Sequence, residues 1–414
     1  LAVAAKHLER DTRTLTHGDI HHLTFLALLH FDDPLRPGMV TSVRDLAGAG
    51  VRVILLTGDH IETANAVARA TGILRPAFRS VEGTSVDLLS DELLADTLRT
   101  VSVVARVDPL QKERMITALQ RRGEVVAMVG DGVNDAVALR RADIGVAVAS
   151  ATDVAKDASD LVLLEGGLSA LTAAVREGRR IRETVRTVLA FLFSTNLTEI
   201  LAVTVSLLAA LPLPFLPAQL LWINVVTDGV VDIALALEPA TTRAGDPKPA
   251  RRRGGIFRPR DLLSMLLTAL AGLIPTMVVF QRALGATGDT AYAQTMAFVT
   301  LASVQLLTAF SYRSLEQPII RLSPWGNPWL LVAEVVSFGL LVLAVHWQPV
   351  VQILGTVPLT PTDWATALVA ALVGFLGVEF RKVLIPLFAD RSGRQKQGTR
   401  GIASHGVTHH AAGA

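Results

Sequence analysis

Two groups of polar residues in the first half of the chain combine side chains that phosphate chemistry uses. Thr57-Gly58-Asp59 follows one short apolar run, and the string Gly-Asp-Gly-Val-Asn-Asp follows another at positions 130–135. Asp131 and Asp135 place two carboxylates four residues apart on a glycine-rich turn, which suits a hard cation such as Mg²⁺. A cation held there would neutralise negative charge on a transferring phosphoryl group.

A third polar residue, Lys112, lies just inside a predicted helix that follows Asp108-Pro109. Its amino group can act as a point charge on a phosphoryl group. Thr57 offers a hydroxyl and an N–H to an anion, and Gly58 lets the backbone approach a ligand closely. Taken singly, Thr-Gly-Asp is a common turn and Lys112 is an ordinary solvated lysine. The three features together, each near the end of a predicted strand, favour a metal–phosphate site.

Polar side chains also interrupt two apolar runs in the second half. Asn196 and Glu199 are three residues apart, and Asn224, Thr227 and Asp228 follow the same helical spacing, so each set shares one helix face. Asp232 lies four residues further on. A carboxylate at mid-membrane costs about 2.5–3.5 kcal/mol on insertion scales, and binding a cation would offset that cost. These oxygen donors suit Ca²⁺, Mg²⁺, Mn²⁺ or alkali ions and do not suit soft Cu(I). The alternative is a structural polar network or a water-lined crevice, which stays open above all for Asp232.

The elements that position the first set are short strands alternating with helices. Six runs rich in Val, Ile and Leu predict strands buried on both faces: Leu23–Phe31, Val51–Leu56, Val101–Ala105, Val125–Val129, Ile144–Val148 and Leu161–Leu164. Helix-like stretches such as Ile61–Ala70 and Pro109–Arg121 lie between them. This alternation predicts a doubly wound, mostly parallel sheet, in which ligands bind at the carboxyl ends of the strands.

The elements that position the second set are predicted membrane spans. Six apolar runs are long enough to cross a bilayer: Val188–Leu211, Ala218–Leu237, Leu262–Phe280, Ala291–Phe310, Leu330–Trp347 and Trp364–Leu387. Arg and Lys lie after the second and fourth runs and at or after the end of the sixth: Arg251, Arg252, Arg253, Arg258, Arg260, Arg313, Arg321, Arg381, Lys382, Arg391, Arg394, Lys396 and Arg400. The alternate loops carry none at 211–217 and 348–363, and only Arg282 at 281–290. The positive-inside rule therefore predicts that the soluble half and the carboxyl terminus are cytoplasmic.

Composition agrees with this division. Of 414 residues, 50% are hydrophobic and 18% are charged, whereas soluble domains carry about 25% charged residues. A purely soluble protein is therefore excluded. The net charge of +2 is too small to argue for a nucleic-acid partner. Cysteine is absent, which excludes disulfides, thiolate metal sites and cysteine nucleophiles.

The motifs of the first half resemble those of a known family. Asp33-Pro34-Leu35-Arg36-Pro37, Thr57-Gly58-Asp59, Lys112 and Gly130–Asp135 resemble the hinge and phosphorylation-domain motifs of P-type cation-transporting ATPases, which belong to the haloacid-dehalogenase superfamily. The resemblance implies ATP and Mg²⁺ as cofactors. It also implies the site roles: Asp131 as Mg²⁺ ligand, Asp135 and Asn134 supporting metal and phosphate, Thr57 and Gly58 on the phosphoryl group, Asp59 near nucleotide and phosphate, and Lys112 stabilising the transferring charge.

The membrane half resembles the calcium-transporting members of that family. Asn196–Glu199 and Leu220–Gly229 look like their fifth and sixth transmembrane helices. The resemblance implies that the transported cation, with Ca²⁺ favoured, is bound by Asn196, Glu199, Asn224, Thr227 and Asp228. Two positions differ from the family's pattern. Ala302 stands at the position that we match to a glutamate ligand of the family's eighth helix, and Asp232 is an additional acid. Other cations, namely Mg²⁺, Mn²⁺, Na⁺, K⁺ and H⁺, therefore stay open.

Two family motifs are missing from the chain. The family's phosphorylated aspartate lies in an Asp-Lys-Thr-Gly-Thr string and its dephosphorylation loop contains Thr-Gly-Glu, and neither string occurs here. We therefore expect an amino-terminally truncated pump that does not form an aspartyl phosphate on its own. The alternatives are a catalytically dead relic and a regulatory membrane partner of an intact pump.

The expected fold class is an α/β, haloacid-dehalogenase-like doubly wound domain followed by an α-helical bundle of six transmembrane helices. The expected divisions are a remnant of the nucleotide domain and hinge with the first strand (1–32), the phosphorylation domain (33–186), the membrane domain (187–388) and a disordered cytoplasmic tail (389–414). A helix over Arg176–Arg186 is expected to link the phosphorylation and membrane domains. Short loops and an Ala- and Arg-rich composition favour a bacterial-type plasma membrane.

Overall fold

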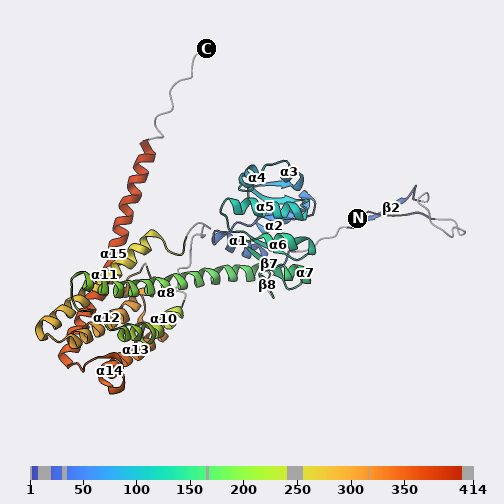
Figure 1. Ribbon diagram of the computed structural model, residues 1–414. Helices are drawn as coiled ribbons and strands as arrows, with labels where there is room; N and C mark the ends of the chain where they lie inside the picture. The colour runs from blue at the N-terminus through green and yellow to red at the C-terminus, as the bar shows by residue number, and fades with distance from the viewer. Residues whose placement is uncertain are drawn as a thin grey trace, which may run out of the picture. The chain divides into compact units, whose positions relative to one another are not determined.

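The computed structural model of the protein describes residues 2–7, 20–29, 35–164, 167–239, 255–315 and 317–402, with side chains of the last helix described up to Lys382. The chain divides into two compact units, Leu1–Thr172 and Ala173–Ala414. The first unit is of α/β type and the second is helical; Figure 1 labels the elements of both. Asp33 and Pro34 of the predicted hinge segment lie outside the described residues.

Residues 35–164 of the first unit form two three-stranded parallel sheets. In one sheet, β5 (Val101–Ala105) lies between β3 (Leu55–Leu56) and β4 (Arg79–Glu82); in the other, β7 (Ile144–Val148) lies between β6 (Ala127–Gly130) and β8 (Leu161–Leu163). Parallel strands joined through helices confirm the predicted α/β class. The sequence did not predict β4, because Arg-Ser-Val-Glu contains only one apolar residue.

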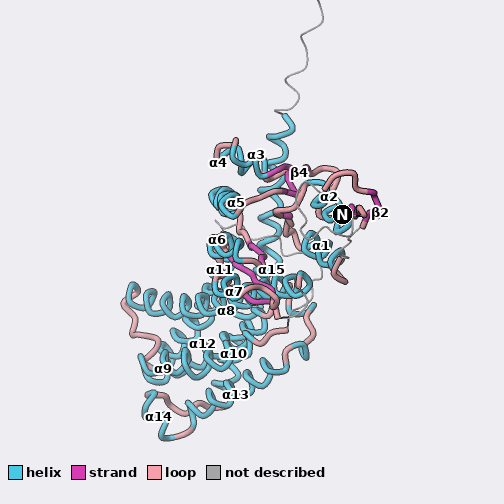
Figure 2. The backbone as a smooth tube through the Cα atoms, turned by 90° about the vertical axis from the view of Figure 1, so that its right-hand side faces the viewer, coloured by secondary structure: helices cyan, strands magenta, loops and turns pink. Residues whose placement is uncertain are grey.

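Seven α-helices connect the strands in this part of the chain: α1 (Met39–Gly48), α2 (Ile61–Thr71), α3 (Gly83–Asp87), α4 (Asp91–Thr97), α5 (Pro109–Arg121), α6 (Ala136–Arg141) and α7 (Asp153–Asp157). Figure 2 draws the strands in magenta and these helices in cyan. The helix α5 packs on both sheets, because Met115 and Ala118 join the hydrophobic cluster around β5 while Ile116 joins the cluster around β6 and β7. The helix α5 therefore connects the two parallel sheets.

Ion pairs tie α4 to α5. Asp91, in the first turn of α4, accepts a hydrogen bond from Nε of Arg114 at 3.0 Å and a second from Arg121. The hydrogen bond from Arg114 holds the pKa of Asp91 below its ordinary value. Because this pKa is lower in the folded state than in the unfolded chain, the ionised carboxylate stabilises the folded state at pH values above its ordinary pKa. That stabilisation is lost as the pH falls through the lowered pKa.

The prediction that the first strand is buried is wrong. Leu23–Phe31 was expected to be buried on both faces, but β2 (Thr24–Leu28) pairs antiparallel with β1 (Ala2–Ala5) and is exposed at every position. An apolar run satisfies strand propensity, whereas burial on both faces needs helices that cover them. Among the described strands β2 has β1 as its partner and belongs to neither parallel sheet.

The elements that follow β8 are helical: α8 (Leu168–Leu208), α9 (Pro217–Trp222), η3 (Ile223–Thr227), α10 (Asp228–Ala236), α11 (Pro259–Thr287), α12 (Thr290–Tyr312), η4 (Ile319–Arg321), η5 (Pro324–Gly326), α13 (Pro328–His346), α14 (Gln348–Leu354) and α15 (Pro361–Ile402). Six segments of the described chain are long and apolar enough to cross a membrane: α8, Pro217–Ala236, α11, α12, α13 and Pro361–Lys382. The predicted number of spans is therefore confirmed. The predicted helix over 176–186 is also confirmed, as part of α8.

Two predicted non-helical segments are partly helical. The helix α11 continues through Arg282 and ends where Gly288 adopts a left-handed conformation, so most of the predicted loop 281–290 is helix. The helix α15 runs on to Ile402 and so includes residues 389–402 of the predicted tail. Residues 403–414 lie outside the described residues.

Close backbone approach brings α11, α12 and α15 together. A Cβ atom at Gly374 of α15 would lie 2.9 Å from the carbonyl oxygen of Ala271 on α11 and 3.2 Å from Cγ of Pro275. A Cβ at Gly272 would lie 3.2 Å from Cγ2 of Thr198 on α8. Small residues at such crossings let membrane helices gain packing contacts.

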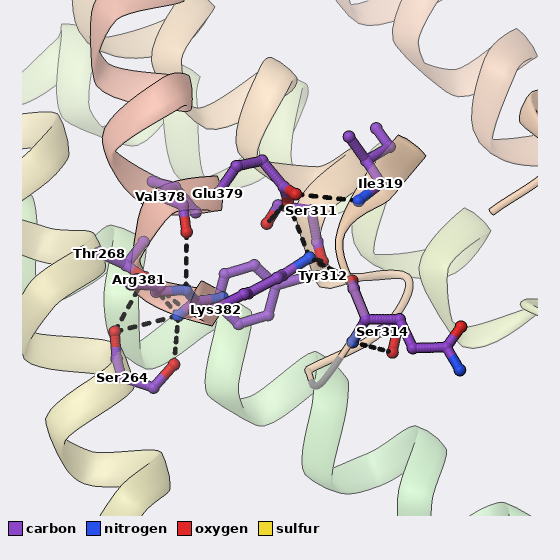
Figure 3. Close-up of polar contacts among 11 residues, drawn as sticks. Ser264, Thr268, Ser311, Tyr312, Ser314, Ile319, Val378, Glu379, Arg381 and Lys382 are labelled. Atoms are coloured by element: carbon purple, nitrogen blue, oxygen red, sulfur yellow. Dashed lines mark hydrogen bonds and ion pairs between the residues drawn. The ribbon is translucent and has the colours of Figure 1, made fainter. Parts of the chain in front are cut away.

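Two basic residues used to predict orientation are buried inside the bundle. Figure 3 shows Arg381 and Lys382, adjacent on α15, with Arg381 close to Ser264 and Thr268 and Lys382 close to Ser311. Nη1 of Arg381 donates to the carbonyl of Ser264 on α11 and to the hydroxyl of Tyr312 on α12, both at 3.0 Å. Nζ of Lys382 donates to the carbonyl of Ser311 on α12 at 2.7 Å and pairs with Glu379 on its own helix at 2.8 Å. Both cations therefore anchor α15 to its neighbours and are not free surface charges.

Candidate functional site

The Thr57-Gly58-Asp59 segment forms a tight turn at the end of β3. The N–H of Thr57 donates to the carbonyl of Val104 at 3.0 Å, which fixes the turn to the neighbouring strand β5. The hydroxyl of Thr57 donates to Oδ2 of Asp59 at 2.9 Å and accepts from the N–H of Asp59 at 3.1 Å. Apart from Gly58 and its two chain neighbours, no described residue has an atom within 4 Å of the position that a Cβ on Gly58 would take. The backbone at Gly58 is therefore open to a ligand.

The loop after β6 is organised around Asp135. Nζ of Lys112 donates to Oδ1 of Asp135 at 2.7 Å, and both side chains are 12% exposed. The N–H groups of Asp131 and Gly132 approach Oδ2 of the same carboxylate at 3.4 Å each. A Cβ at Gly130 would lie 2.6 Å from Cβ of Asp135, so only glycine fits there. Asp135 thus organises the loop and holds Lys112.

The structure links the three motifs through α5. The carbonyl of Thr57 accepts a hydrogen bond from the N–H of Val107 at 3.1 Å, just before the helix begins. Asp108 and Gln111 then form a reciprocal cap at its first turn. One turn of helix positions Lys112 to reach Asp135 on the loop after β6. The end of β3 and the end of β6 are therefore connected by a short chain of contacts.

Two residues of this loop are free to meet a ligand. Asp131 and Asn134 are exposed, and neither side chain has a hydrogen bond to a described residue. Mg²⁺ is usually held by one or two carboxylates, with water and substrate phosphates completing its octahedron. The exposed carboxylate of Asp131 fits that requirement, whereas both oxygens of Asp135 already have partners.

In the second unit, Glu199 lies at the centre of the predicted ion ligands. This residue of α8 is 6% exposed. Its Oε2 accepts from Nδ2 of Asn224 at 2.8 Å, which confirms that α8 and η3 bring these two predicted ligands together. Its Oε1 accepts from Nε2 of Gln305 on α12 at 3.1 Å. Asp228, at the start of α10, is close enough for its charge to interact with that of Glu199.

The predicted helix carrying Asn224, Thr227 and Asp228 is not a regular α-helix. Residues 223–227 form a π-helical turn, η3, between α9 and α10, and such turns occur frequently at functional sites. The hydroxyl of Thr227 donates to the carbonyl of Ile223 at 2.7 Å. Asp228 is only 1% exposed, and its Oδ2 has no hydrogen-bond partner among the described residues. Oδ1 of Asp232 is likewise shielded and unpartnered within the described chain.

The predicted ligand Asn196 has its hydrogen bond within its own helix, and the residue of α12 that contacts Glu199 is Gln305 and not Ala302. Nδ2 of Asn196 donates to the carbonyl of Leu192 on its own helix at 2.8 Å. Ala302 is buried in an apolar cluster, and Gln305, three residues later on α12, is the residue that contacts Glu199. The signal that could have found Gln305 is a polar amide within an apolar span. No group of three or more acidic or histidine side chains in the described chain is arranged to hold a metal, so amide, hydroxyl and carbonyl oxygens would have to complete a cation site.

A separate polar network fixes the end of α10. Arg313, predicted to be a loop charge, is 7% exposed and pairs with Glu238, with Nη2 at 2.9 Å from Oε1. Asn327 donates to the carbonyl of Ala234 at 2.9 Å and to Glu238 at 2.8 Å. The segment between α12 and α13 therefore holds the helix on which Asp228 and Asp232 lie.

Comparisons with known proteins agree with both units. Residues 3–143 match the family described as haloacid dehalogenase-like hydrolase, and residues 212–384 match the family described as cation transporting ATPase, C-terminus. The chain is 37% identical over 347 residues to a calcium-transporting ATPase of Bacillus subtilis, an alignment that covers 83% of this chain and 38% of that protein. The chain belongs to the P-type cation-transporting ATPases. It matches a carboxyl-terminal portion of them.

Two further relatives of this P-type ATPase chain show the same coverage. It is 32% identical over 385 residues to calcium-transporting ATPase 1 of Bacillus cereus, covering 88% of the chain and 43% of the relative. It is 36% identical over 337 residues to calcium-transporting ATPase type 2C member 2 of Mus musculus, covering 81% and 36%. The chain spans about two fifths of the length of these curated relatives. The predicted family is therefore confirmed.

Proposed function

We propose that this chain supplies ion-binding helices and part of the phosphorylation domain of an ATP-driven calcium pump. The observation that carries the proposal is the arrangement around Glu199, whose two oxygens are held by the amides of Asn224 and Gln305 beside the buried Asp228. A buried carboxylate oxygen without a partner, as on Asp228, is unfavourable unless a ligand completes the site. Carboxylate and amide oxygens are the donors that Ca²⁺ prefers. The relatives named above are calcium-transporting ATPases.

We propose roles for residues of the first unit on the basis of the contacts that they make. Asp131 would hold Mg²⁺ with Asn134 beside it, and Asp135 would position Lys112 toward the phosphoryl group of ATP. Thr57 and Gly58 would offer a hydroxyl and open backbone to that group, with Asp59 orienting Thr57 through their hydrogen bonds. When bound, Mg²⁺ neutralises phosphoryl charge. Asn196 and Thr227 would join the ion site through Oδ1 and the hydroxyl oxygen, because their present bonds to their own helices use only their N–H and O–H donors.

We also propose an orientation in a bacterial-type plasma membrane. Arg258, Arg260 and Arg321 are exposed, and they lie in segments that the positive-inside rule assigns to the cytoplasm. The first unit and the carboxyl terminus would then be cytoplasmic. The six candidate spans support integration into the bilayer.

Equilibrium binding to the full chain tests the ion site. We expect the chain, purified in detergent, to bind radioactive Ca²⁺ saturably, and Asp228→Asn to lose that binding because the substitution removes the most deeply buried charge of the site. Competition by Mg²⁺, Mn²⁺, Na⁺, K⁺ and acid measures which cation the site prefers.

Asp363→Asn is the matched control. Asp363 lies in the first turn of α15 and accepts a hydrogen bond from Tyr292, away from the Glu199 contacts. This variant should bind Ca²⁺ as the unmodified chain does. Equal binding by Asp228→Asn and the unmodified chain, or tighter binding of another cation, would overturn the calcium assignment.

A further inference from the structure

The helix α13 carries one carboxylate, Glu334, within an otherwise apolar span. The neighbouring residues Val332, Val335 and Val336 are exposed, as expected for side chains that face lipid. Glu334 differs from them because its Oε1 is shielded from solvent and has no hydrogen-bond partner among the described residues. A carboxylate in such a place is functional in most membrane proteins, because it is unfavourable to insert without a partner.

Contacts of α13 direct this carboxylate toward the ion site. Ser337 lies one turn after Glu334 on the same helix face, and its hydroxyl donates to the carbonyl of Thr227 at 3.2 Å. Thr227 is the last residue of the π-helical turn and directly precedes Asp228. The charges of Glu334 and Asp228 are close enough to repel each other.

A neutral side chain gives independent evidence for a cation at this place. Gln305 is 2% exposed, and its amide nitrogen donates to Glu199, but its carbonyl oxygen Oε1 has no partner within the described chain. Shielded, unpartnered oxygens therefore come from three helices, on Asp228, Gln305 and Glu334. Buried polar atoms are rarely left without partners, and oxygens from several elements are what a hard cation needs.

We propose that Glu334 is a further ligand of the transported cation, added to the Asp228 site from α13. The inference rests on the proposed ion-binding function. The sequence predicted ion ligands on two elements, α8 and the α9–η3–α10 segment. Gln305 adds α12 as a third element, and Glu334 adds α13 as a fourth. The additional negative charge would favour a divalent over a monovalent cation.

Two measurements on the full chain in detergent test the role of Glu334. We expect Glu334→Gln to weaken Ca²⁺ binding by about 10–100-fold, the range found when groups that support a metal are removed. The thermal unfolding midpoint without Ca²⁺ should not fall, because the substitution removes a repulsion with Asp228. Glu334→Asp keeps the charge and should retain more affinity than Glu334→Gln. The Asp363→Asn control should bind like the unmodified chain.

The outcomes separate this inference from the proposed function. If the unmodified chain binds Ca²⁺ and Asp228→Asn does not, while Glu334→Gln binds as tightly as the unmodified chain, only the role of Glu334 is wrong. Weaker binding together with a lower midpoint would show a structural residue and would also overturn the inference. No binding by the unmodified chain would overturn both proposals.

Discussion

At the scale of single residues, Asp135 is the most constrained group of the candidate phosphate site. Lys112 holds one of its oxygens, and the N–H groups of Asp131 and Gly132 approach the other. A carboxylate with both oxygens engaged is better suited to orienting its neighbours than to binding a metal alone. Mg²⁺ could bind to the exposed carboxylate of Asp131 without breaking these contacts.

Replacing Lys112 by Met should loosen the loop after β6. The substitution leaves Asp135 largely buried without its cation, and a lost hydrogen bond to a charged group costs about 1.5–3 kcal/mol. We expect faster hydrogen–deuterium exchange in peptides that cover β6 and the 3₁₀ turn η2 (Val133–Asp135). Lys156→Met on α7 is the control, because the amino group of Lys156 has no partner among the described residues. Unchanged exchange in Lys112→Met would contradict the organising role of Asp135.

At the scale of elements, the membrane helices are held by two kinds of contact. Close backbone crossings join α11 to α15 at Gly374 and α11 to α8 at Gly272. Buried cations add directional bonds, with Arg381 reaching α11 and α12 from α15. Since Gln305 on α12 contacts Glu199 on α8, the packing of α11, α12 and α15 also sets the geometry of the ion site.

Gly374→Ala should destabilise the crossing of α11 and α15. The added Cβ would lie 2.9 Å from a backbone carbonyl oxygen, which cannot move as a side chain can, and overpacking costs roughly 1–3 kcal/mol. A lower thermal midpoint in detergent is the expected result. Gly339→Ala on α13 is the control, because no described atom lies within 4 Å of its new Cβ. Equal midpoints for the two variants would mean that the crossing tolerates a methyl group.

At the scale of the whole molecule, the chain joins two units with separate chemistry. The first has its hydrophobic clusters around parallel strands, and the second has its own among membrane helices. The helix α8 begins at Leu168, within the first unit, and carries the candidate ion ligand Glu199 in the second. The Asp-Lys-Thr-Gly-Thr string of the family does not occur in the 414 residues.

We therefore predict that this chain by itself does not form a phosphoenzyme. Aspartyl-phosphate formation needs a carboxylate nucleophile, and Asp131 and Asp59 are assigned here to metal and turn positions. Incubation with Mg²⁺ and γ-labelled ATP should leave no acid-stable, hydroxylamine-sensitive label. The calcium-transporting ATPase of Bacillus subtilis, treated in parallel, is the positive control. Label on the chain would show that one of its own aspartates is a nucleophile.

The sequence alone was enough to predict the class of fold and the six candidate spans, and it singled out Glu199 and Asn224, which the structure brings together. These features follow from local signals: hydrophobic length, alternation of strands with helices, and helical spacing of polar residues. The same local signals gave wrong predictions where the burial of a residue depends on which other elements pack against it. An apolar run predicted β2 to be buried, and a basic residue such as Arg313 looked like a free loop charge.

Only the tertiary structure decided which distant side chains meet. The contacts of Gln305 with Glu199 and of Lys112 with Asp135 join elements far apart in the chain. A polar residue in an apolar span has many possible partners, and spacing along one helix cannot choose among them. Helix packing makes that choice, because it determines which faces are buried together and which oxygens are left for a cation.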